Sequence, residues 1–185
     1  TLERVPREKV VILSKTKATT EAEMKADLDR FRKELNTDYI DILLLHFMTD
    51  PNWPEVKQGA MNVLSRARED GIIGAHGVSC HTLGALEAAA DSDWVQVDMA
   101  RINPAGVRMD ADVPTIEKVL SRMRKDGKGI VGMKVFGAGQ LRDRTDESLE
   151  YVLGLDSIDA FTIGQEHQGE TRDLLTKIPA ASVRA

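Results

Sequence analysis

The chain has 185 residues, of which 42% are hydrophobic and 30% charged, and its formal net charge is -5. These values are ordinary for a globular domain with one sizeable core. Scarce aromatic residues and the lack of a Lys/Arg-rich stripe argue against nucleic-acid binding. Apolar runs are far shorter than the ~20 residues of a membrane span, so no membrane segment is predicted. Cys80 is the only cysteine, so neither an internal disulfide nor a thiolate metal site is predicted.

Short apolar runs alternate with longer amphipathic runs along the chain. The short runs predict β-strands at residues 10–15, 38–46, 72–79, 94–100, 129–135 and 160–164. The longer runs predict helices at about 20–35, 54–70, 82–92, 113–125, 146–155 and 170–178. Thr19 or Thr20 can cap the first helix, Pro54 can open the second, and Gly71 is expected to end it. The sequence therefore predicts six consecutive β-α units.

Strands that are apolar on both faces and joined by helices predict a parallel sheet covered with helices. An open doubly wound sheet and a closed (β/α)8 barrel are the two common solutions. No Gly-x-Gly-x-x-Gly follows the first strand, which counts against a dinucleotide-binding open sheet. The ~25 to 35 residues in each unit suit a barrel of about 250 residues. We predict one α/β domain of the (β/α)8 TIM-barrel type over residues 1–185, with about six of eight units present and the first two strands missing.

Polar residues follow the predicted strands at the end where such barrels carry their chemistry. Taken alone, a lysine or histidine at a strand end is more often structural than catalytic. Several polar groups at corresponding strand ends are harder to dismiss, because burying each without a partner is costly. The residues concerned are Lys15, His46, Ser79, Cys80, His81, Arg101, Asn103, Lys134 with the following FGAGQ, and Gly164 to Glu166.

Blocks of the sequence resemble the aldo-keto reductase family. They are REKVVILSKT, LDRFRKELNTDYIDILLLH, EDGIIGAHGVSCHTLGAL, WVQVDMARIN, GIVGMKVFGAGQL and FTIG. Each block alone is modest in specificity, but the blocks follow one another in the family's order. GVSCH and RINPAG are similar to a bacterial branch of the family. The resemblance implies a cytoplasmic, NAD(P)H-dependent oxidoreductase that reduces a small aldehyde or ketone to an alcohol by hydride transfer.

The resemblance also implies roles for individual residues. By motif position, Lys15 is the lysine and His46 the histidine of the family's catalytic Asp-Tyr-Lys-His tetrad. The lysine lowers the pKa of the tyrosine, which donates a proton to the substrate, and the histidine orients the carbonyl oxygen. The implied cofactor-binding residues are Ser79, Cys80, Gln96, Met133, Lys134, Gly137 and Gly164. The cofactor is NADP(H) or NAD(H), and the sequence leaves the choice open.

The sequence departs from the family pattern in lacking the block with the tetrad Asp and Tyr before residue 10. Tyr39 lies seven residues before His46, which is ~23 Å along a strand, and Tyr151 falls on an outer helix. We expect the missing Asp and Tyr in an N-terminal portion outside this chain. The alternatives are a non-catalytic, redox-sensing barrel that binds a nicotinamide nucleotide, and an unrelated barrel in which Lys15 forms a Schiff base.

Overall fold

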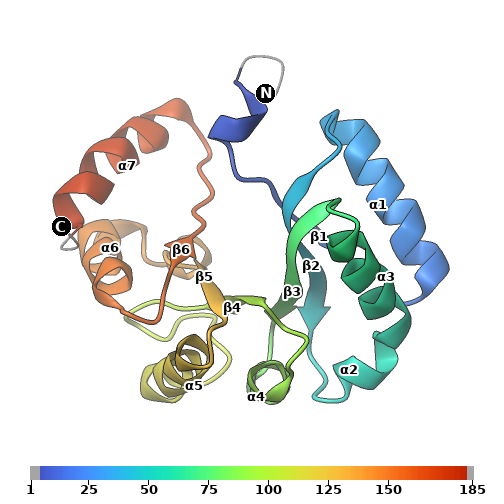
Figure 1. The fold of residues 1–185 in the computed structure, drawn as a ribbon. Coiled ribbons are helices and arrows are strands. Elements are labelled where there is room, and N and C mark those ends of the chain that lie inside the picture. The colour runs from blue at the N-terminus through green and yellow to red at the C-terminus, as the bar shows by residue number, and fades with distance from the viewer. Residues whose placement is uncertain (1–4, 183–185) are drawn as a thin grey trace. The chain divides into compact units, whose positions relative to one another are not determined.

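The computed structural model describes residues 5–182, in which strands and helices alternate (Figure 1). The strands are β1 (Leu13–Thr16), β2 (Ile40–Met48), β3 (Ile73–Cys80), β4 (Val97–Arg101), β5 (Gly129–Met133) and β6 (Ala160–Phe161). The α-helices are α1 (Glu21–Leu35), α2 (Trp53–Val56), α3 (Gln58–Glu69), α4 (Leu83–Asp91), α5 (Val113–Lys125), α6 (Thr145–Gly154) and α7 (Gln168–Ala181). The 3-10 helices are η1 (Arg7–Lys9), η2 (Gly137–Gly139) and η3 (Arg142–Arg144). The predicted six-fold alternation is confirmed.

The strands lie in one sheet in chain order, β1-β2-β3-β4-β5-β6. The β1–β2, β2–β3 and β5–β6 pairs are parallel. Parallel neighbours need a crossover between them, and each crossover here contains a helix, as the sequence predicted. The carboxyl ends of neighbouring strands therefore lie at the same edge, where the predicted polar residues follow them.

Two compact units make up the chain. The first contains Thr1–Cys80 and Gly84–Asp98, and the second contains His81–Leu83 and Met99–Ala185. In the first unit, helices α1 and α3 lie side by side over the strands (Figure 1), and Leu43, Leu44 and Leu45 of β2 are fully buried. Three consecutive buried leucines require apolar surroundings on both faces of the strand. In the second unit, the core includes Ile116 and Leu120 of α5, Ile130 of β5 and Leu149 of α6.

The first helix begins where the sequence predicted, for the predicted reason. The hydroxyl of Thr20 accepts the Glu23 amide N–H at 3.2 Å, while the Glu23 carboxylate accepts the amides of Thr19 and Thr20 at 2.8 and 2.9 Å. This is a capping box, which satisfies amides that have no partner within the helix. The helix ends at Asn36, which adopts the left-handed conformation with φ 50°.

Several boundaries differ from the prediction. Strand β2 covers residues 40–48 instead of 38–46, β5 ends at Met133 instead of residue 135, and β6 ends at Phe161 instead of residue 164. The first strand begins at Leu13 instead of residue 10. The Val10 carbonyl accepts from the Arg7 guanidinium and the Ile12 amide donates to the Asp41 carboxylate, each at 2.8 Å, so these groups bond to side chains and not to strand backbone. The fourth begins at Val97 instead of residue 94, because the Val95 amide donates to the Ser92 carbonyl at 3.3 Å and closes a turn that contains Trp94. The second predicted helix is broken into α2 and α3 at Lys57.

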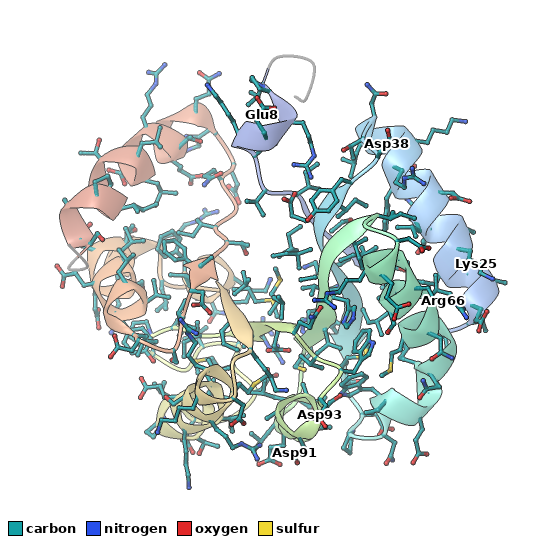
Figure 2. The ribbon with its side chains drawn as sticks, viewed as in Figure 1. Glu8, Lys25, Asp38, Arg66, Asp91 and Asp93 are labelled. Atoms are coloured by element: carbon teal, nitrogen blue, oxygen red, sulfur yellow. The ribbon has the colours of Figure 1, made fainter. Side chains whose placement is uncertain are left out.

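Charged residues cover the outer faces of the helices in the first unit. Figure 2 labels Lys25 on α1 and Arg66 on α3, and both pair with the Glu21 carboxylate, at 3.5 and 3.1 Å. The neighbouring Arg66 lowers the pKa of Glu21, but exposed pairs of this kind contribute little to stability. Among the described residues, no helix is both long enough and apolar enough to cross a membrane.

Candidate functional site

Lys15 and His46 lie on the same face of neighbouring strands in the first unit. Lys15 is paired with Leu44 across the β1–β2 ladder, and His46 follows Leu44 by two residues. Paired residues of a parallel ladder share a face, and residues two apart on a strand share it as well. Both residues are half-buried and stand at the carboxyl ends of their strands. This is the juxtaposition that the sequence predicted for them.

A β-bulge shapes the end of β2 at His46. The β2–β3 ladder pairs Leu45 with Val78 and then Met48 with Cys80, so that His46 and Phe47 together face Ser79. Phe47 has a φ of 69°, which is uncommon for a residue other than glycine, and it is 53% exposed. Bulges and positive φ values of this kind are common beside functional sites, where they re-aim a side chain.

The Ser79 hydroxyl holds this bulge together. It is fully buried and lies 2.9 Å from His46 Nδ1, and it accepts the Phe47 amide N–H at 3.2 Å. A hydroxyl has one hydrogen to donate and can accept two hydrogen bonds. Ser79 was predicted to bind cofactor, and that role stays a prediction. Its link to His46 was not predicted, because it depends on the bulge.

Positive charges surround His46. Its pKa is lowered, first by burial and then by the nearby ammonium groups of Lys15 and Lys17. Both effects disfavour a second proton on the ring. The His46 imidazole is therefore biased towards its neutral form near neutral pH, in which one nitrogen donates and the other accepts a hydrogen bond.

The structure separates Cys80 and Gln96 from the His46–Ser79 pair. Cys80 is fully buried, and its thiol donates to the Ala85 carbonyl of α4 at 3.4 Å. The Gln96 side-chain oxygen accepts the His76 amide N–H at 3.3 Å, three residues before Ser79 on β3. At ~3.3 Å per residue, this contact lies ~10 Å along the strand from Ser79. The predicted cofactor contacts of Cys80 and Gln96 stay predictions.

In the second unit, the segment after β5 has an unusual backbone. Lys134, Gly137, Ala138 and Gly139 all have positive φ values, of 60°, 56°, 59° and 90°. Met133 is buried and Lys134 is exposed. At Gly137 a Cβ would come within 2.9 Å of a Val107 methyl group, so this glycine is needed for close packing.

Asn103 fixes this segment to the loop that follows β4. Its amide nitrogen donates to the carbonyls of Val107 and Lys134, at 2.8 and 3.2 Å. Its side-chain oxygen accepts the amides of Ala105 and Val107, at 3.2 and 3.0 Å. Asn103 is completely buried, and these contacts use its two donors and both lone pairs. Lys134 is therefore presented by a backbone that is held in place.

The strand β6 leads into an open, polar segment. Gly164 is exposed, and nothing lies within 4 Å of the position that its Cβ would take. The Arg142 guanidinium pairs with Glu166 at 2.5 Å, and His167 caps α7 by accepting the Glu170 amide at 3.3 Å. Gly164 therefore leaves backbone accessible beside a cluster of charged residues.

Arg101 and Asp110 form a buried ion pair that the sequence did not single out as a pair. Asp110 has a side chain only 1% exposed, and its carboxylate accepts from the Arg101 guanidinium, which also donates to the His81 carbonyl at 2.7 Å. Burial raises the pKa of Asp110, while Arg101 opposes that rise. The pair ties the loop after β4 to His81.

Neither tyrosine of the chain belongs to the strand ends that carry Lys15 and His46. Tyr39 precedes β2, at the opposite end of that strand from His46, and its hydroxyl lies against Gly74. Tyr151 lies on α6, where its hydroxyl donates to the Glu117 carboxylate at 2.6 Å. Burial and this carboxylate raise the pKa of Tyr151, which makes it a weaker acid.

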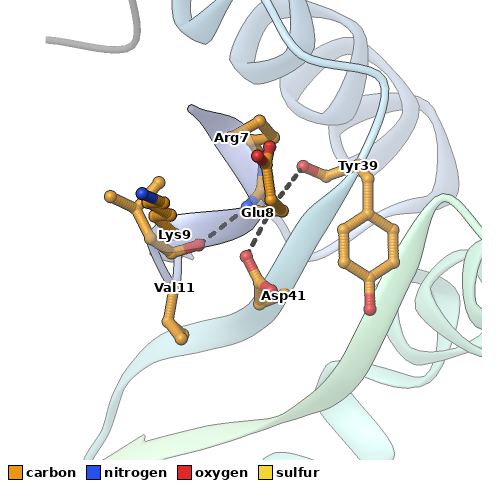
Figure 3. A pocket seen from close by; sticks show the side chains of 7 residues that line it. Arg7, Glu8, Lys9, Val11, Tyr39 and Asp41 are labelled. Atoms are coloured by element: carbon orange, nitrogen blue, oxygen red, sulfur yellow. Dashed lines mark hydrogen bonds and ion pairs between the residues drawn. The ribbon is translucent and has the colours of Figure 1, made fainter. Parts of the chain in front are cut away.

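A cavity of about 490 Å³ opens at the amino end of β2 (Figure 3). Arg7 crosses it to bind the Asp41 carboxylate at 2.5 Å and the Tyr39 carbonyl at 2.9 Å. The same carboxylate accepts the Ile12 amide at 2.8 Å. The cavity lies at the end of β2 opposite His46, and its contacts fasten the N-terminal segment to the sheet.

Comparison with known proteins identifies the class. The family model described as "Aldo/keto reductase family" matches residues 1–164. The chain belongs to the aldo/keto reductase family, and this supports an oxidoreductase that acts on carbonyl groups. No match was found among curated proteins.

Solved aldo-keto reductases share the fold. PA4992 from Pseudomonas aeruginosa, assigned as an aldo-keto reductase, is 24% identical with a TM-score of 0.79, over 97% of this chain and 71% of that one. The holo form of AKR11C1 from Bacillus halodurans is 15% identical with a TM-score of 0.77, over 98% and 70%. The glycerol dehydrogenase AKR11B4 from Gluconobacter oxydans is 14% identical with a TM-score of 0.65, over 98% and 75%. The predicted (β/α)8 class, with about six units in this chain, is confirmed.

Proposed function

We propose that this chain is part of an NAD(P)H-dependent oxidoreductase that reduces a small aldehyde or ketone to the alcohol. The observation that carries the proposal is the placement of Lys15 and His46 on one face at the carboxyl ends of β1 and β2. By the resemblance of their motifs, we assign these two residues to the family's tetrad lysine and histidine. Family membership supports carbonyl chemistry in general. We propose that Lys15 and His46 are side chains that take part in it.

His46 is suited to donate a hydrogen bond to a carbonyl oxygen. When the Ser79 hydroxyl donates to Nδ1, the proton of the neutral ring resides on Nε2. Burial and the charges of Lys15 and Lys17 lower the pKa of His46 and so favour this neutral donor. A donor of fixed orientation stabilises the negative charge that develops on the oxygen during reduction.

The residues of the second unit fit an anionic dinucleotide. The exposed Lys134 offers an ammonium group on a braced backbone, and Gly164 leaves open space where a side chain would otherwise stand. A cation and an accessible backbone are typical partners of phosphate groups. When bound, NAD(P)H supplies the hydride that the carbonyl carbon receives. We propose Lys134 and Gly164 as cofactor contacts, with either NADH or NADPH.

The proton for the carbonyl oxygen needs a further donor. Tyr39 and Tyr151 are held elsewhere, by the start of β2 and by Glu117 respectively. We propose that the family's Asp and Tyr come from protein outside these 185 residues. In that arrangement, the Lys15 ammonium lowers the pKa of the tyrosine, which then protonates the oxygen.

The placement of the two tyrosines also favours a second candidate function. A barrel without a proton donor beside Lys15 would bind a nicotinamide nucleotide and turn nothing over, and it could report the redox state of the nucleotide pool. Turnover separates the two candidates. Steady oxidation of NAD(P)H in the presence of aldehydes or ketones supports the reductase, and binding without turnover of any carbonyl supports the sensor.

The first experiment titrates NADPH and NADH into the protein and follows nicotinamide fluorescence. We expect binding of at least one nucleotide, and we expect Lys134→Ala to weaken it about tenfold through the loss of a charge-assisted contact. Lys125→Ala is the matched control, because Lys125 is an exposed lysine at the end of α5 in the same unit. Absence of binding of either nucleotide at millimolar concentration would overturn the proposal.

The second experiment tests Lys15 in protein that includes the residues preceding this chain. Lys15→Met should lower turnover by roughly 10²-fold and leave cofactor affinity unchanged, because the charge that acidifies the phenol is lost. Lys25→Met, on the exposed face of α1, should change neither. Unchanged turnover in Lys15→Met would contradict the role of this strand end.

A further inference from the structure

Lys57 stands at the break between α2 and α3, where its backbone has φ -95° and ψ 5°. Its ammonium group donates to the carbonyls of Lys17 and Ala18 at 3.0 and 3.1 Å, and to the Thr19 hydroxyl at 2.7 Å. An ammonium has three hydrogens to donate, and all three have acceptors here. Those acceptors lie in the β1–α1 loop, residues 17–20, which begins directly after Thr16 at the end of β1.

The start of α3 packs against the same loop. The Ala60 amide in the first turn of α3 donates to the Thr19 carbonyl at 3.2 Å. This amide is one of those that a helix leaves unpaired at its start. At Gly59 a Cβ would come within 3.0 Å of the Glu21 amide nitrogen and 3.4 Å of the Thr19 carbonyl oxygen. Helix α3 therefore lies close to the loop, and Lys57 binds the loop from the residue that precedes this helix.

Other side chains hold the loop from the α1 side. The Glu23 carboxylate accepts the amides of Thr19 and Thr20. The Thr16 hydroxyl accepts the Ala18 amide at 2.9 Å and donates to the Asp27 carboxylate. The amides of the loop are thus held from α1 and β1, while carbonyls at Lys17, Ala18 and Thr19 are held from Lys57 and α3.

This loop borders the His46 site. It joins the end of β1, where Lys15 lies, to α1, and it carries Lys17. The ammonium groups of Lys15 and Lys17 both act on the His46 imidazole. Lys15 is placed by its pairing with Leu44 in the β1–β2 ladder, whereas Lys17 belongs to the loop. The position of the loop therefore sets how closely the charge of Lys17 approaches His46, because the energy of charge–charge interaction falls with distance.

We propose that Lys57 is a positioning residue: it clamps the β1–α1 loop directly after β1 and so places Lys17 relative to Lys15 and His46. This inference rests on the proposed function for the catalytic meaning of Lys15 and His46. The clamp itself rests on the three hydrogen bonds of Lys57 and on the packing of α3 at Gly59. Lys57 touches none of the reacting groups and acts through the loop.

The test compares Lys57→Met with Thr19→Val. The first variant removes the whole clamp, and the second removes one acceptor while leaving the lysine and the Thr19 amide contact in place. Lys25→Met is the matched control, because it removes an exposed lysine of the same unit that pairs only with Glu21 in the structure. Circular dichroism establishes that each variant is folded, and Thr19→Val carries the test if Lys57→Met does not fold.

The readout is the pKa of His46, obtained by NMR titration of its ring protons. In Lys57→Met the loop is released, so the positive charge of Lys17 acts less on His46 and the pKa of His46 should rise. Thr19→Val should shift the pKa in the same direction by less, and Lys25→Met should leave it unchanged. A folded Lys57→Met or Thr19→Val variant with the wild-type His46 pKa would overturn the proposal.

Turnover in the longer protein supplies the second readout. Lys57→Met should lower kcat about tenfold with little change in the Kd for NADPH, because orientation of the carbonyl-binding groups is lost and the second unit is untouched. The two failures are distinguishable. If neither the wild type nor any variant reduces a carbonyl compound, the proposed function is wrong. The shift in the His46 pKa would still show whether Lys57 positions the loop.

Discussion

At the scale of single residues, one hydroxyl organises the end of β2. Ser79 contacts both residues of the bulge opposite it, His46 through the ring and Phe47 through the amide. The extra residue in a bulge leaves an amide outside the regular ladder, and a buried amide needs a partner. Ser79 supplies that partner and at the same time orients the imidazole. Ser79 thus has a structural role, that of binding both residues of the bulge, and this role is independent of any cofactor.

We therefore predict that Ser79→Ala destabilises the protein by about 1–3 kcal/mol, the range for removing the partner of buried polar groups. Urea unfolding measures this difference. The matched control is Ser148→Ala: Ser148 is also fully buried, but its hydroxyl has no hydrogen-bond partner among the described residues, so we expect a change within about 0.5 kcal/mol.

The same variant should alter the protonation pattern of His46. Without the Ser79 hydroxyl, Nδ1 loses its hydrogen-bond partner, and ¹⁵N chemical shifts of the ring should show a changed tautomer ratio. A ratio identical to that of the wild type would contradict the orienting role of Ser79.

At the scale of elements, the loops after the strands are held by side chains more than by backbone pairing. Lys57 and Glu23 hold the β1–α1 loop, and Asn103 holds the loop after β4 to the segment after β5. When every donor and acceptor of a buried side chain is hydrogen-bonded, a substitution that exchanges a donor for an acceptor leaves buried partners unpaired. Such loops can stay ordered beside a binding site without being part of the sheet.

Asn103→Asp tests this rigidity. The carboxylate keeps the acceptors for Ala105 and Val107 but faces the carbonyl oxygens of Val107 and Lys134, which the amide group had bound. We expect a loss of at least about 2 kcal/mol in urea unfolding, because a buried charge meets two unpaired acceptors. Asn62→Asp is the control, since exposed Asn62 only accepts from Gln58 on α3 and should change stability little.

At the scale of the whole molecule, pH should act through one buried histidine. His76 is 6% exposed and stacks on Trp94, with ring centroids 4.3 Å apart. Burial, followed by the charge of Arg68, lowers the pKa of His76 from 6.5 to about 4. Between these two values the unfolded chain binds the proton and the folded chain does not. This contribution to stability is therefore present above pH 6.5 and is lost as the pH falls towards 4.

We predict that the free energy of unfolding falls by about 2 kcal/mol between pH 7 and pH 5 on account of His76. Tryptophan fluorescence is a suitable probe, because both tryptophans lie in the first unit: Trp94 stacks on His76, and Trp53 lies against Trp94, with ring centroids 6.4 Å apart. His76→Phe keeps an aromatic ring on Trp94 and cannot titrate. The free energy of unfolding of this variant should therefore fall by about 2 kcal/mol less than that of the wild type between pH 7 and pH 5. An equal pH dependence in the two proteins would show that His76 is not responsible.

Much of the fold could be predicted because its signals are local. Hydrophobic periodicity predicted six β-α units, and a cap at Thr19 or Thr20 predicted the start of α1; the structure has Thr20 in a capping box with Glu23, which involves residues three apart. Asp112 similarly starts α5 at the predicted Val113 by accepting the Thr115 amide at 2.9 Å. The motif blocks indicated the family, and strand ends indicated where Lys15 and His46 would lie.

Other features depend on partners that are distant in the sequence. The break at Lys57 was not predicted, because the acceptors of its ammonium lie about 40 residues earlier. The bulge at His46 was not predicted, because it is defined only by the register of β2 against β3. The same holds for Gln96, whose side chain is used by the His76 amide, and for the burial of Asp110 against Arg101.

The sequence by itself determined the order of strands and helices, the family, and the strand ends at which Lys15 and His46 stand. Only the tertiary structure decided what surrounds those residues. The Ser79 hydroxyl lies against His46, lysine charges act on the imidazole, and Lys57 holds the β1–α1 loop. The physical reason is the separation in sequence between the residues that interact. Periodicity and caps arise from neighbours within one or two turns of chain, whereas hydrogen bonds and charge interactions at a site join residues that only folding brings together.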